Sequence, residues 1–416
     1  MYRKSVLKNG AIIATEELSY TNSLALAVWL KVGSRDEAKG EEGLCHFLEH
    51  MVFKGTSQKN THEIARELDS IGGISDAITG KESICFYVKL LPKHLNKAKD
   101  IMLDILLNPR FDPVDLELER QVVLQELNMI EDSPEDYIYD LLCKAIYGEH
   151  PLGRPVIGSR EAIGLLNRES LLDFWENQLY GRNMLISVSG KVSHDLIVDL
   201  FSPGLECIKS NGHMPMRTRP HSINNIEILE RDLAQVHMAI GFEAPQLNHK
   251  MRMPCAILNC ILGGTMSSRL FQKVREQEGL VYSIYSSYAP YSDTGIFSVY
   301  FATEKENVNQ VLKIVKEEIS TLIHQSPTED ELLNAKEYLL AGMYLGSETP
   351  ESRMFRNAKM EMHLGRYVSL EELEHLINNV SKSEVQEVAN MVLGTYPPAI
   401  AVIGPISYGE IKENIS

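Results

Sequence analysis

Residues 46–50 of the chain read His46-Phe47-Leu48-Glu49-His50, and this short stretch decides how the rest of the sequence is interpreted. On a helix, positions four apart lie about 40° from each other around the axis, so the two imidazoles leave the same face. Glu49 points from that face as well. The pattern therefore brings two ring nitrogens and one carboxylate to a single point.

Imidazole nitrogen is a preferred ligand of Zn²⁺, and a bound zinc lowers the pKa of its water to about 7. A nearby carboxylate can take the proton of that water as it attacks a carbonyl, which is the chemistry of peptide-bond hydrolysis. The order His-x-x-Glu-His reverses the commoner zinc-peptidase helix and is the inverzincin signature. The alternative is an amphipathic helix with two solvated histidines, because so short a pattern also arises by chance.

A third zinc ligand is expected on a later helix. Asp112 and Pro113 are typical of a helix start, as N-cap and first helical residue. The following helix carries Glu119 and Glu126, which share a face but lie about 10 Å apart along the axis, so one ion cannot bind both. The economical arrangement uses Glu126 as the zinc carboxylate and Glu119 as a support for a ligating histidine. Taken alone, either glutamate could be solvated surface.

The zinc motif lies within a longer block that resembles a known family. The block is similar, almost letter for letter, to the motif of the M16 zinc metallopeptidases, the group that includes pitrilysin, insulysin and the mitochondrial processing peptidase. It reads Gly43-Leu44-Cys45-His46-Phe47-Leu48-Glu49-His50-Met51-Val52-Phe53-Lys54-Gly55-Thr56. Further segments that resemble family blocks are residues 72–79, 147–148, 150–153, 263–271 and 275–282. The resemblance covers both halves of the chain, and it implies that Glu126 is the third zinc ligand.

The resemblance also implies roles outside the metal motif. Arg275 and Tyr282 are similar to residues of the second half that reach the substrate backbone or the developing oxyanion, an electrostatic role in catalysis. Glu119 is assigned to proton handling or support of the site. We therefore expect Glu49, Glu119, Arg275 and Tyr282 to take part in catalysis.

Residues 72–79 resemble the strand that lies beside bound substrate in this family, which implies substrate contacts from Gly73, Asp76, Ala77 and Thr79. One position departs from the family pattern, because Asp76 stands where asparagine is usual. Aspartate keeps the acceptor oxygen, lacks the amide donor and adds a negative charge. The zinc ligands are unaffected by this difference.

Composition favours a soluble globular enzyme. Apolar residues make up 44% of the 416 residues and charged residues 24%, so disorder is not expected. There is no apolar run of the roughly 18 residues that a membrane span needs and no signal-like N-terminal core, so we expect a cytoplasmic protein without a membrane partner. The six cysteines show no paired CxxC spacing, which favours reduced thiols. A net charge of -16 disfavours nucleic acid as a partner.

The chain is long enough for two domains of about 200 residues, and it resembles itself when offset by half its length. An offset of 214 residues places Glu16 on Glu230, and residues 185–189 on residues 399–403. The same offset puts Cys260, Gly263 and Gly264 opposite the zinc motif, so no metal site is expected in the second half. We predict a zinc-binding half at residues 1–210, a polar linker at 211–225 and a homologous half at 226–416.

Within each half the patterning predicts an α+β fold, a mostly antiparallel sheet covered by helices on one face. Residues 24–30 and 85–88 are typical of strands, and residues 62–72, 94–107, 113–131 and 305–323 are typical of helices. The family resemblance adds that two such halves form a clamshell around unfolded peptide and that chains of this length pair as dimers.

The sequence thus predicts a zinc-dependent endopeptidase that acts on short or unfolded polypeptides, with Zn²⁺ as cofactor and a homodimer as the assembly. His46, His50 and Glu126 are the predicted ligands, and Glu49 is the general base. The alternative is a non-catalytic or scaffold subunit of a heteromeric complex of the same family. Such subunits typically have a damaged metal motif, whereas this motif is intact.

Overall fold

The chain forms two compact units, each built around one sheet. The computed structural model describes residues 1–212, 216–394 and 397–410. Unit 1 comprises Met1–Asn128, Arg154–Thr218 and Gly346–Tyr367, and unit 2 comprises Met129–Gly153, Arg219–Leu345 and Val368–Ser416. Each unit therefore contains segments from distant parts of the sequence.

Unit 1 contains a six-stranded sheet in the order β1-β2-β6-β3-β5-β4. Only the β2–β6 pair is parallel, and the other pairs are antiparallel. The strands are β1 (Tyr2–Val6), β2 (Ile12–Glu17), β3 (Leu24–Leu30), β4 (Ile74–Thr79), β5 (Ile84–Leu90) and β6 (Met184–Gly190). The helices that begin in this unit are α1 (Leu44–Met51), α2 (Thr61–Ser70), α3 (Leu95–Leu107), α4 (Pro113–Asp132), α6 (Arg160–Leu165), α7 (Arg168–Gln178), α8 (His194–Leu205) and α12 (Pro350–Leu364).

Unit 2 contains a five-stranded sheet in the order β7-β11-β8-β10-β9. Its strands are β7 (Ile226–Glu230), β8 (Val236–Glu243), β9 (Ser283–Pro290), β10 (Gly295–Thr303) and β11 (Ala399–Gly404). Its helices are α5 (Pro134–Tyr147), α9 (Arg252–Asn259), α10 (Val308–His324), α11 (Glu329–Leu345), α13 (Leu370–Asn378) and α14 (Lys382–Leu393), with π-helical turns at Cys260–Gly264 and Phe271–Gln277.

Apart from the additional strand β1, the two sheets have the same topology, which confirms the internal duplication predicted from the sequence. The order β2-β6-β3-β5-β4 of sheet 1 corresponds to β7-β11-β8-β10-β9 of sheet 2, and in both the first pair is parallel. The parallel register differs by one residue, since Ile12 is opposite Leu185 whereas Ile226 is opposite Ile400. The predicted α+β class is confirmed, and β3 has the predicted bounds of 24–30.

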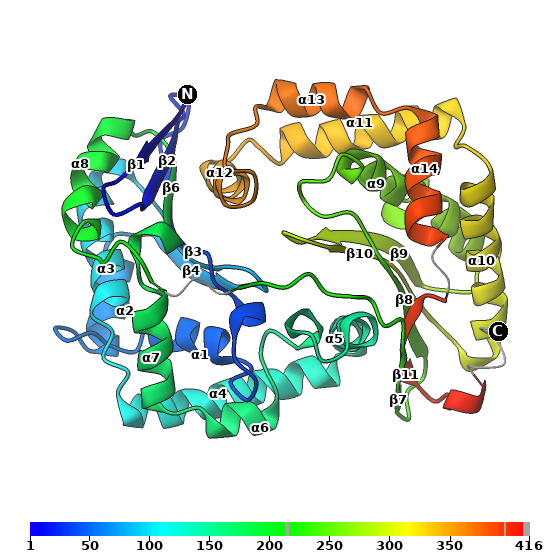
Figure 1. Ribbon diagram of the computed structural model, residues 1–416, viewed down its shortest axis with the longest axis horizontal. Helices are drawn as coiled ribbons and strands as arrows, with labels where there is room; N and C mark the ends of the chain where they lie inside the picture. Colours follow the sequence, from blue (N-terminus) through cyan, green and yellow to red (C-terminus); the bar gives the residue numbers. More distant parts are fainter. Residues whose placement is uncertain (213–215, 395–396, 411–416) are drawn as a thin grey trace. The chain divides into compact units, whose positions relative to one another are not determined.

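The compact units differ from the predicted halves 1–210 and 226–416, because each unit takes one helix from the other half of the sequence. Helix α12 packs on β2, β3 and β6 of unit 1, and α5 packs on β7, β8 and β11 of unit 2 (Figure 1). The offset of 214 residues places α5 on α12, so the exchanged helices are equivalent elements. Each sheet therefore has a helix on both faces, rather than on one face as predicted.

Small residues explain why a single helix, α12 or α5, can lie on one face of each sheet. In sheet 1 that face presents Ala14, Ala25 and Ala27 to Met354 and Ala358 of α12. In sheet 2 the corresponding face is again rich in alanine, with Ala239, Ala302, Ala399 and Ala401 beneath α5. At Gly241 even a Cβ would come within 2.7 Å of the Ile146 side chain on α5. The opposite faces carry larger side chains and pack against α3, α7 and α8 in unit 1 and α9, α10 and α14 in unit 2 (Figure 1).

The predicted linker at 211–225 includes residues 213–215, which lie outside the described residues. Two arginines that follow these residues, Arg217 and Arg219, are each held by an acidic side chain. Arg217 donates from Nε and from one terminal nitrogen to the two carboxylate oxygens of Asp36, at 2.8 and 2.7 Å, within unit 1. Arg219 forms an ion pair with Glu243 at 3.0 Å, within unit 2.

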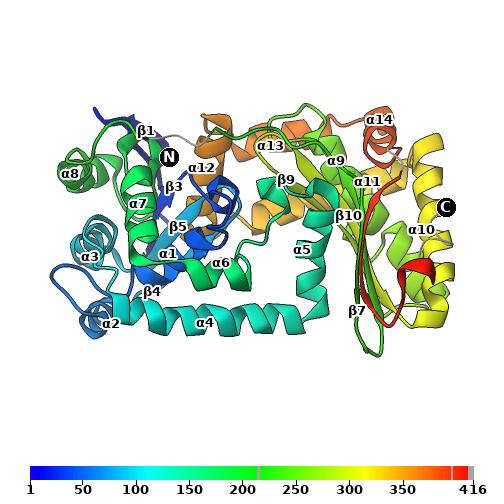
Figure 2. The same cartoon turned by 60° about the horizontal axis from the view of Figure 1, so that its bottom comes forward.

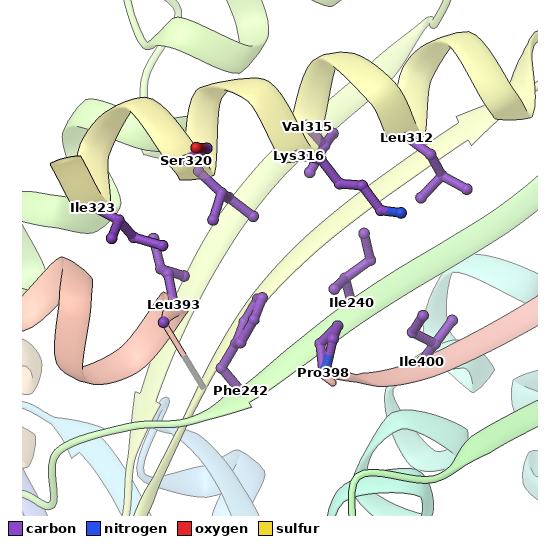
Figure 3. Close-up of a pocket in the computed structure, with 12 residues that line it drawn as sticks. Ile240, Phe242, Leu312, Val315, Lys316, Ser320, Ile323, Leu393, Pro398 and Ile400 are labelled. Atoms are coloured by element: carbon purple, nitrogen blue, oxygen red, sulfur yellow. The ribbon is translucent and has the colours of Figure 1, made fainter. Parts of the chain in front are cut away.

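Unit 2 contains a cavity of about 290 Å³ between α10 and the strands β8 and β11 (Figure 3). Its lining is apolar apart from Lys316 and Ser320 on α10. Gly394 and Pro398 at its edge flank residues 395–396, which are not among the described residues. None of the described helices is both long enough and apolar enough to cross a bilayer.

Candidate metal centre

Helix α1 carries the His-x-x-Glu-His motif, and its N-terminus is fixed by a buried carboxylate. Glu37 accepts hydrogen bonds from the backbone N–H groups of Gly43, at 2.9 Å, and Cys45, at 2.7 Å. These are among the N–H groups that a helix start leaves without an internal partner. Burial raises the pKa of Glu37 to about 8. Gly43 has a φ of 93°, and a Cβ there would lie 2.3 Å from the carbonyl oxygen of Ile157, so only glycine fits.

The two faces of α1 have different partners. Phe47, Leu48 and Met51 are fully buried in the core of unit 1 and hold the helix in place. His46 and His50 leave the other face, toward α4, which runs past α1 (Figure 2). The rings of the two histidines lie 4.8 Å apart between centroids. The predicted helical placement of the motif is therefore found, and one face of the helix remains available for a ligand.

The three predicted zinc ligands come together in the structure. His46 Nε2 lies 3.6 Å from Oε1 of Glu126, and His50 Nε2 lies 3.6 Å from Oε2 of the same carboxylate. One donor atom from each residue lies within 4.8 Å of the others, and this is the single group of that kind that the described residues form. All three residues are partly buried.

The donor set and its spacing fit a zinc ion. Two imidazoles and one carboxylate are the ligands of catalytic zinc sites, which leave the fourth position for water or substrate. Tetrahedral zinc with bonds of about 2.0–2.1 Å needs ligand atoms roughly 3.3–3.4 Å apart. The 3.6 Å separations of the nitrogen and carboxylate atoms are close to that value. The spacing of these nitrogen and oxygen atoms is therefore compatible with a bound zinc ion.

The protonation states also suit a metal site. Burial lowers the pKa of His46 to about 4, against an opposing effect of Glu126, so this imidazole is neutral and its lone pair is free. The neighbouring carboxylate of Glu126 is the main cause that raises the pKa of His50, and Glu119 adds to it. The same contact with His50 lowers the pKa of Glu126, so that carboxylate is ionised near neutral pH.

Glu119 lies behind His50, in the supporting position predicted for it. Its Oε2 lies 3.1 Å from His50 Nδ1, and its side chain is almost fully buried. Its other oxygen, Oε1, lies 2.5 Å from Nζ of Lys54. His46 differs, because its Nδ1 is buried and has no hydrogen-bond partner among the described residues. Lys54 lies in the block quoted above, yet sequence reasoning assigned it no role.

Glu49, the predicted general base, is held by strand β4. The hydroxyl of Thr79 donates to Oε2 of Glu49 at 2.5 Å. Burial is the main cause that raises the pKa of Glu49, and the charges of Asp76 and Glu126 add to it. A raised pKa makes the carboxylate a stronger base. The substrate contact predicted for Thr79 stays a prediction, and its side-chain hydroxyl bonds to Glu49.

The other predicted substrate residues lie at or near β4, which is the edge strand of sheet 1. Asp76 is exposed, and its Oδ1 accepts the backbone N–H of Ala77 at 2.8 Å while its Oδ2 accepts the Tyr87 hydroxyl at 3.4 Å. Gly73 directly precedes the strand. Ile74 and Ile78, 62% and 47% exposed, lie on the face of the sheet that also carries Cys85 and Tyr87, and sequence patterning did not single them out.

Arg275 and Tyr282 lie together in unit 2. The Arg275 guanidinium stands 5.4 Å from the ring centroid of Tyr282 and 4.7 Å from that of Phe271, both cation–π distances. Arg275 belongs to the π-helical turn Phe271–Gln277, a conformation often found at functional sites. Tyr282 is 79% exposed. The roles assigned to this pair by resemblance stay predictions.

Comparison with known proteins identifies the family. Residues 12–160 match the family described as insulinase (peptidase family M16), and residues 165–339 match the family described as the peptidase M16 inactive domain. A Bacillus subtilis protein named as an uncharacterized zinc protease, YmxG, is 36% identical over 97% of this chain and 98% of its own length. An uncharacterized zinc protease of Mycobacterium tuberculosis is also 36% identical, over 97% of this chain and 93% of its own length.

Solved structures agree with this assignment at the level of the fold. A protease from Helicobacter pylori superimposes with a TM-score of 0.91 at 20% identity, over 97% of this chain and 99% of that one. A Pseudomonas fluorescens structure described as a peptidase M16 inactive domain gives the same TM-score and identity, over 98% of both chains. The family matches together span more than half of the sequence, and the relatives align over nearly all of it. The chain therefore belongs to peptidase family M16, whose members of similar sequence are named zinc proteases.

Proposed function

We propose that the protein is a zinc-dependent endopeptidase that hydrolyses peptide bonds in short or unfolded polypeptides. The observation that carries the proposal is the convergence of His46, His50 and Glu126 on one point, with Glu49 on the same helix as the two histidines. This is a donor set for zinc with a base beside it. A scaffold subunit needs neither feature, and the zinc-protease names of the relatives do not favour that alternative.

Each residue of the site has a definite task in this reaction. Zinc, when bound by the three ligands, supplies a Lewis acid that polarises the scissile carbonyl and makes water acidic enough to react at neutral pH. Glu49 accepts the proton of the attacking water and passes it to the leaving nitrogen. Thr79 keeps the Glu49 carboxylate in one orientation through the 2.5 Å hydrogen bond. Glu119 holds the proton on Nδ1 of His50, so that Nε2 is the nitrogen left to bind the ion.

The proposed substrate class follows from strand β4. This strand is paired with β5 on one side, and no other described strand pairs with its second side. An extended polypeptide can add to such an edge through backbone hydrogen bonds. A folded protein offers few free strands for that purpose, so short or unfolded chains are the expected substrates. Ile74 and Ile78 provide apolar contacts beside the edge.

We also propose that two copies of the chain assemble as a homodimer, as the family resemblance implies. Light scattering on the zinc-loaded protein measures this directly. A mass of about twice the 46.9 kDa chain is expected. A fully active species at the mass of one chain contradicts the dimer.

The enzymatic proposal is tested with a library of internally quenched peptides, incubated with zinc-loaded protein and with protein treated with a chelator. We expect cleavage by the zinc-loaded form alone, and recovery of the chelated form when zinc is returned. A stably folded globular domain in the same assay should remain uncut. A protein that binds zinc at this site yet cleaves no peptide would favour the scaffold alternative.

A further inference from the structure

We propose that Lys54 is a positioning residue of the metal site, which acts through Glu119 to orient His50. The inference rests on the proposed zinc site and extends it by one residue. Lys54 lies three residues beyond Met51, the last residue of α1, and the ion pair found for its ammonium is with Glu119 and not with one of the three ligands. Its effect must therefore pass through the carboxylate that it contacts.

The two oxygens of Glu119 have different partners. Oε1 lies 2.5 Å from Nζ of Lys54, and Oε2 lies 3.1 Å from Nδ1 of His50. The Glu119 side chain is 7% exposed, whereas that of Lys54 is 31% exposed. A carboxylate so far removed from water is costly unless it is paired and hydrogen-bonded. Lys54 supplies the countercharge, and its exposed side keeps its own desolvation small.

The two contacts together determine the state of the His50 ring. A carboxylate oxygen only accepts, so the contact with Glu119 keeps the proton on Nδ1 and leaves the lone pair on Nε2. Nε2 is the atom that lies 3.6 Å from Glu126. Without Lys54, Oε1 of Glu119 would be buried without a partner, and the carboxylate could rotate away from His50 to reach water. The ring of His50 would then lose the group that orients it.

Two hydrogen bonds hold the backbone of Lys54 in place. Its N–H donates to the carbonyl of Met51 at 3.1 Å, and its carbonyl accepts the hydroxyl of Thr61 at 2.7 Å. Thr61 is the first residue of α2, and Met51 is the last of α1. The lysine is thus placed by the turn between the two helices, which makes a defined geometry with Glu119 possible.

Loss of Lys54 should disturb the orientation of His50 and leave that of His46 unchanged. Nδ1 of His46 has no hydrogen-bond partner among the described residues, so no carboxylate fixes that ring in the same way. Core packing of α1 positions both histidines, but only His50 receives this additional support. Loss of Lys54 should therefore weaken zinc binding without abolishing it.

The experiment compares zinc affinities, measured by competition with a chromophoric chelator, of the wild type and of five variants. Lys54→Met removes the charge and keeps most of the side-chain volume, and Lys54→Arg keeps the charge. Lys59→Met is the matched control, because Lys59 also bridges two carboxylates, Glu67 and Asp104, in the same loop but away from the ligands. Glu119→Gln and the double variant with Lys54→Met complete the set. Supporting residues of this kind typically change metal affinity about 10–100-fold.

We expect Lys54→Met to weaken zinc binding about 10-fold or more, Lys54→Arg to retain most of the affinity, and Lys59→Met to remain near the wild type. In the Glu119→Gln background, Lys54→Met should have no further effect, since residues that act through a shared partner are not additive. The visible absorption of the cobalt-substituted protein should change in Lys54→Met and not in Lys59→Met, a readout of ligand geometry that a loss of fold stability does not produce.

Two results overturn the proposal: wild-type zinc affinity in Lys54→Met while Glu119→Gln is impaired, or additive effects in the double variant. If Lys54→Met does not fold, Lys54→Gln gives the same comparison. A wild-type protein that binds no zinc removes the proposed function and this inference together. A wild type that binds zinc with an unaffected Lys54→Met removes only the inference.

Discussion

The hydroxyl of Thr79, at the end of an edge strand, lies 2.5 Å from Oε2 of Glu49 on the metal helix. A hydrogen bond to a charged group contributes about 1.5–3 kcal/mol, which corresponds to roughly 10-fold to 100-fold in rate if it is needed in the transition state. Strand β4, which is proposed to bind substrate, is therefore joined by a hydrogen bond to Glu49, the proposed base.

We expect Thr79→Val to lower kcat for peptide hydrolysis about 10-fold or more, with zinc content unchanged, because the carboxylate loses its orientation. Thr79→Ser keeps the hydroxyl and should restore most of the rate. Thr21→Val is a suitable control, since the Thr21 hydroxyl donates to the carbonyls of Leu18 and Ser23. An unchanged kcat in Thr79→Val contradicts this role.

A second prediction concerns the metal ligand on α4. Glu126→Gln should lose zinc as well as activity, because a neutral amide replaces the charged ligand that lies 3.6 Å from both histidines. Elemental analysis should find about one zinc per chain in the wild type and far less in the variant. Glu117→Gln on the same helix is the control, since the exposed Glu117 side chain pairs with Arg120 and not with a zinc ligand. Full zinc content in Glu126→Gln would exclude it as a ligand.

The pH dependence of zinc binding follows from the histidine pKa values. Burial lowers the pKa of His46 to about 4, whereas Glu126 and Glu119 raise the pKa of His50 above its ordinary value of 6.5. At pH 6 the zinc-free protein thus carries a proton on His50 and none on His46. Zinc binding should release about one proton at pH 6, and zinc affinity should rise with pH until it passes the pKa of His50. Calorimetry in two buffers of different ionisation enthalpy counts this proton, and release of two protons at pH 6 would contradict the assignment to His50 alone.

Much of the local structure could be predicted from the sequence, because it depends on periodicity and helix-start chemistry. The strand at 24–30 has the bounds that its apolar run predicted, and α4 ends one residue beyond the predicted 113–131. The His-x-x-Glu-His spacing predicted two imidazoles on one helix face, and they are found there. These features are encoded by residues close together in the chain.

The exchange of α5 and α12 could not be predicted in the same way. An amphipathic helix has an apolar face, but its sequence does not state which sheet will cover that face. The contacts of Lys54 with Glu119, and of Thr79 with Glu49, likewise join residues distant in sequence. Lys54 stood in a recognised block, and only the three-dimensional neighbourhood shows what its ammonium contacts.

The exchanged helices lead to a prediction about folding. A fragment of residues 1–210 lacks α12, so the face of sheet 1 that carries Trp29 and Ala27 is exposed to water. A fragment of residues 226–416 lacks α5 and exposes the face beneath it. Each fragment alone should therefore bind a hydrophobic dye and unfold without a sharp transition, whereas the two co-expressed should purify as a complex. Cooperative thermal unfolding of either fragment alone would show that the exchange is not required for folding.

The central claim is that Glu49 is the base of a zinc peptidase, and Glu49→Gln tests it most directly because the amide removes the base and leaves every ligand in place. The measurement is the rate at which the zinc-loaded variant hydrolyses a quenched peptide relative to the wild type, with zinc content determined on the same samples. We predict about one zinc per chain in both proteins and a rate lower by roughly 10²–10⁴-fold in the variant. Hydrolysis at the wild-type rate by Glu49→Gln with its zinc bound would contradict the account.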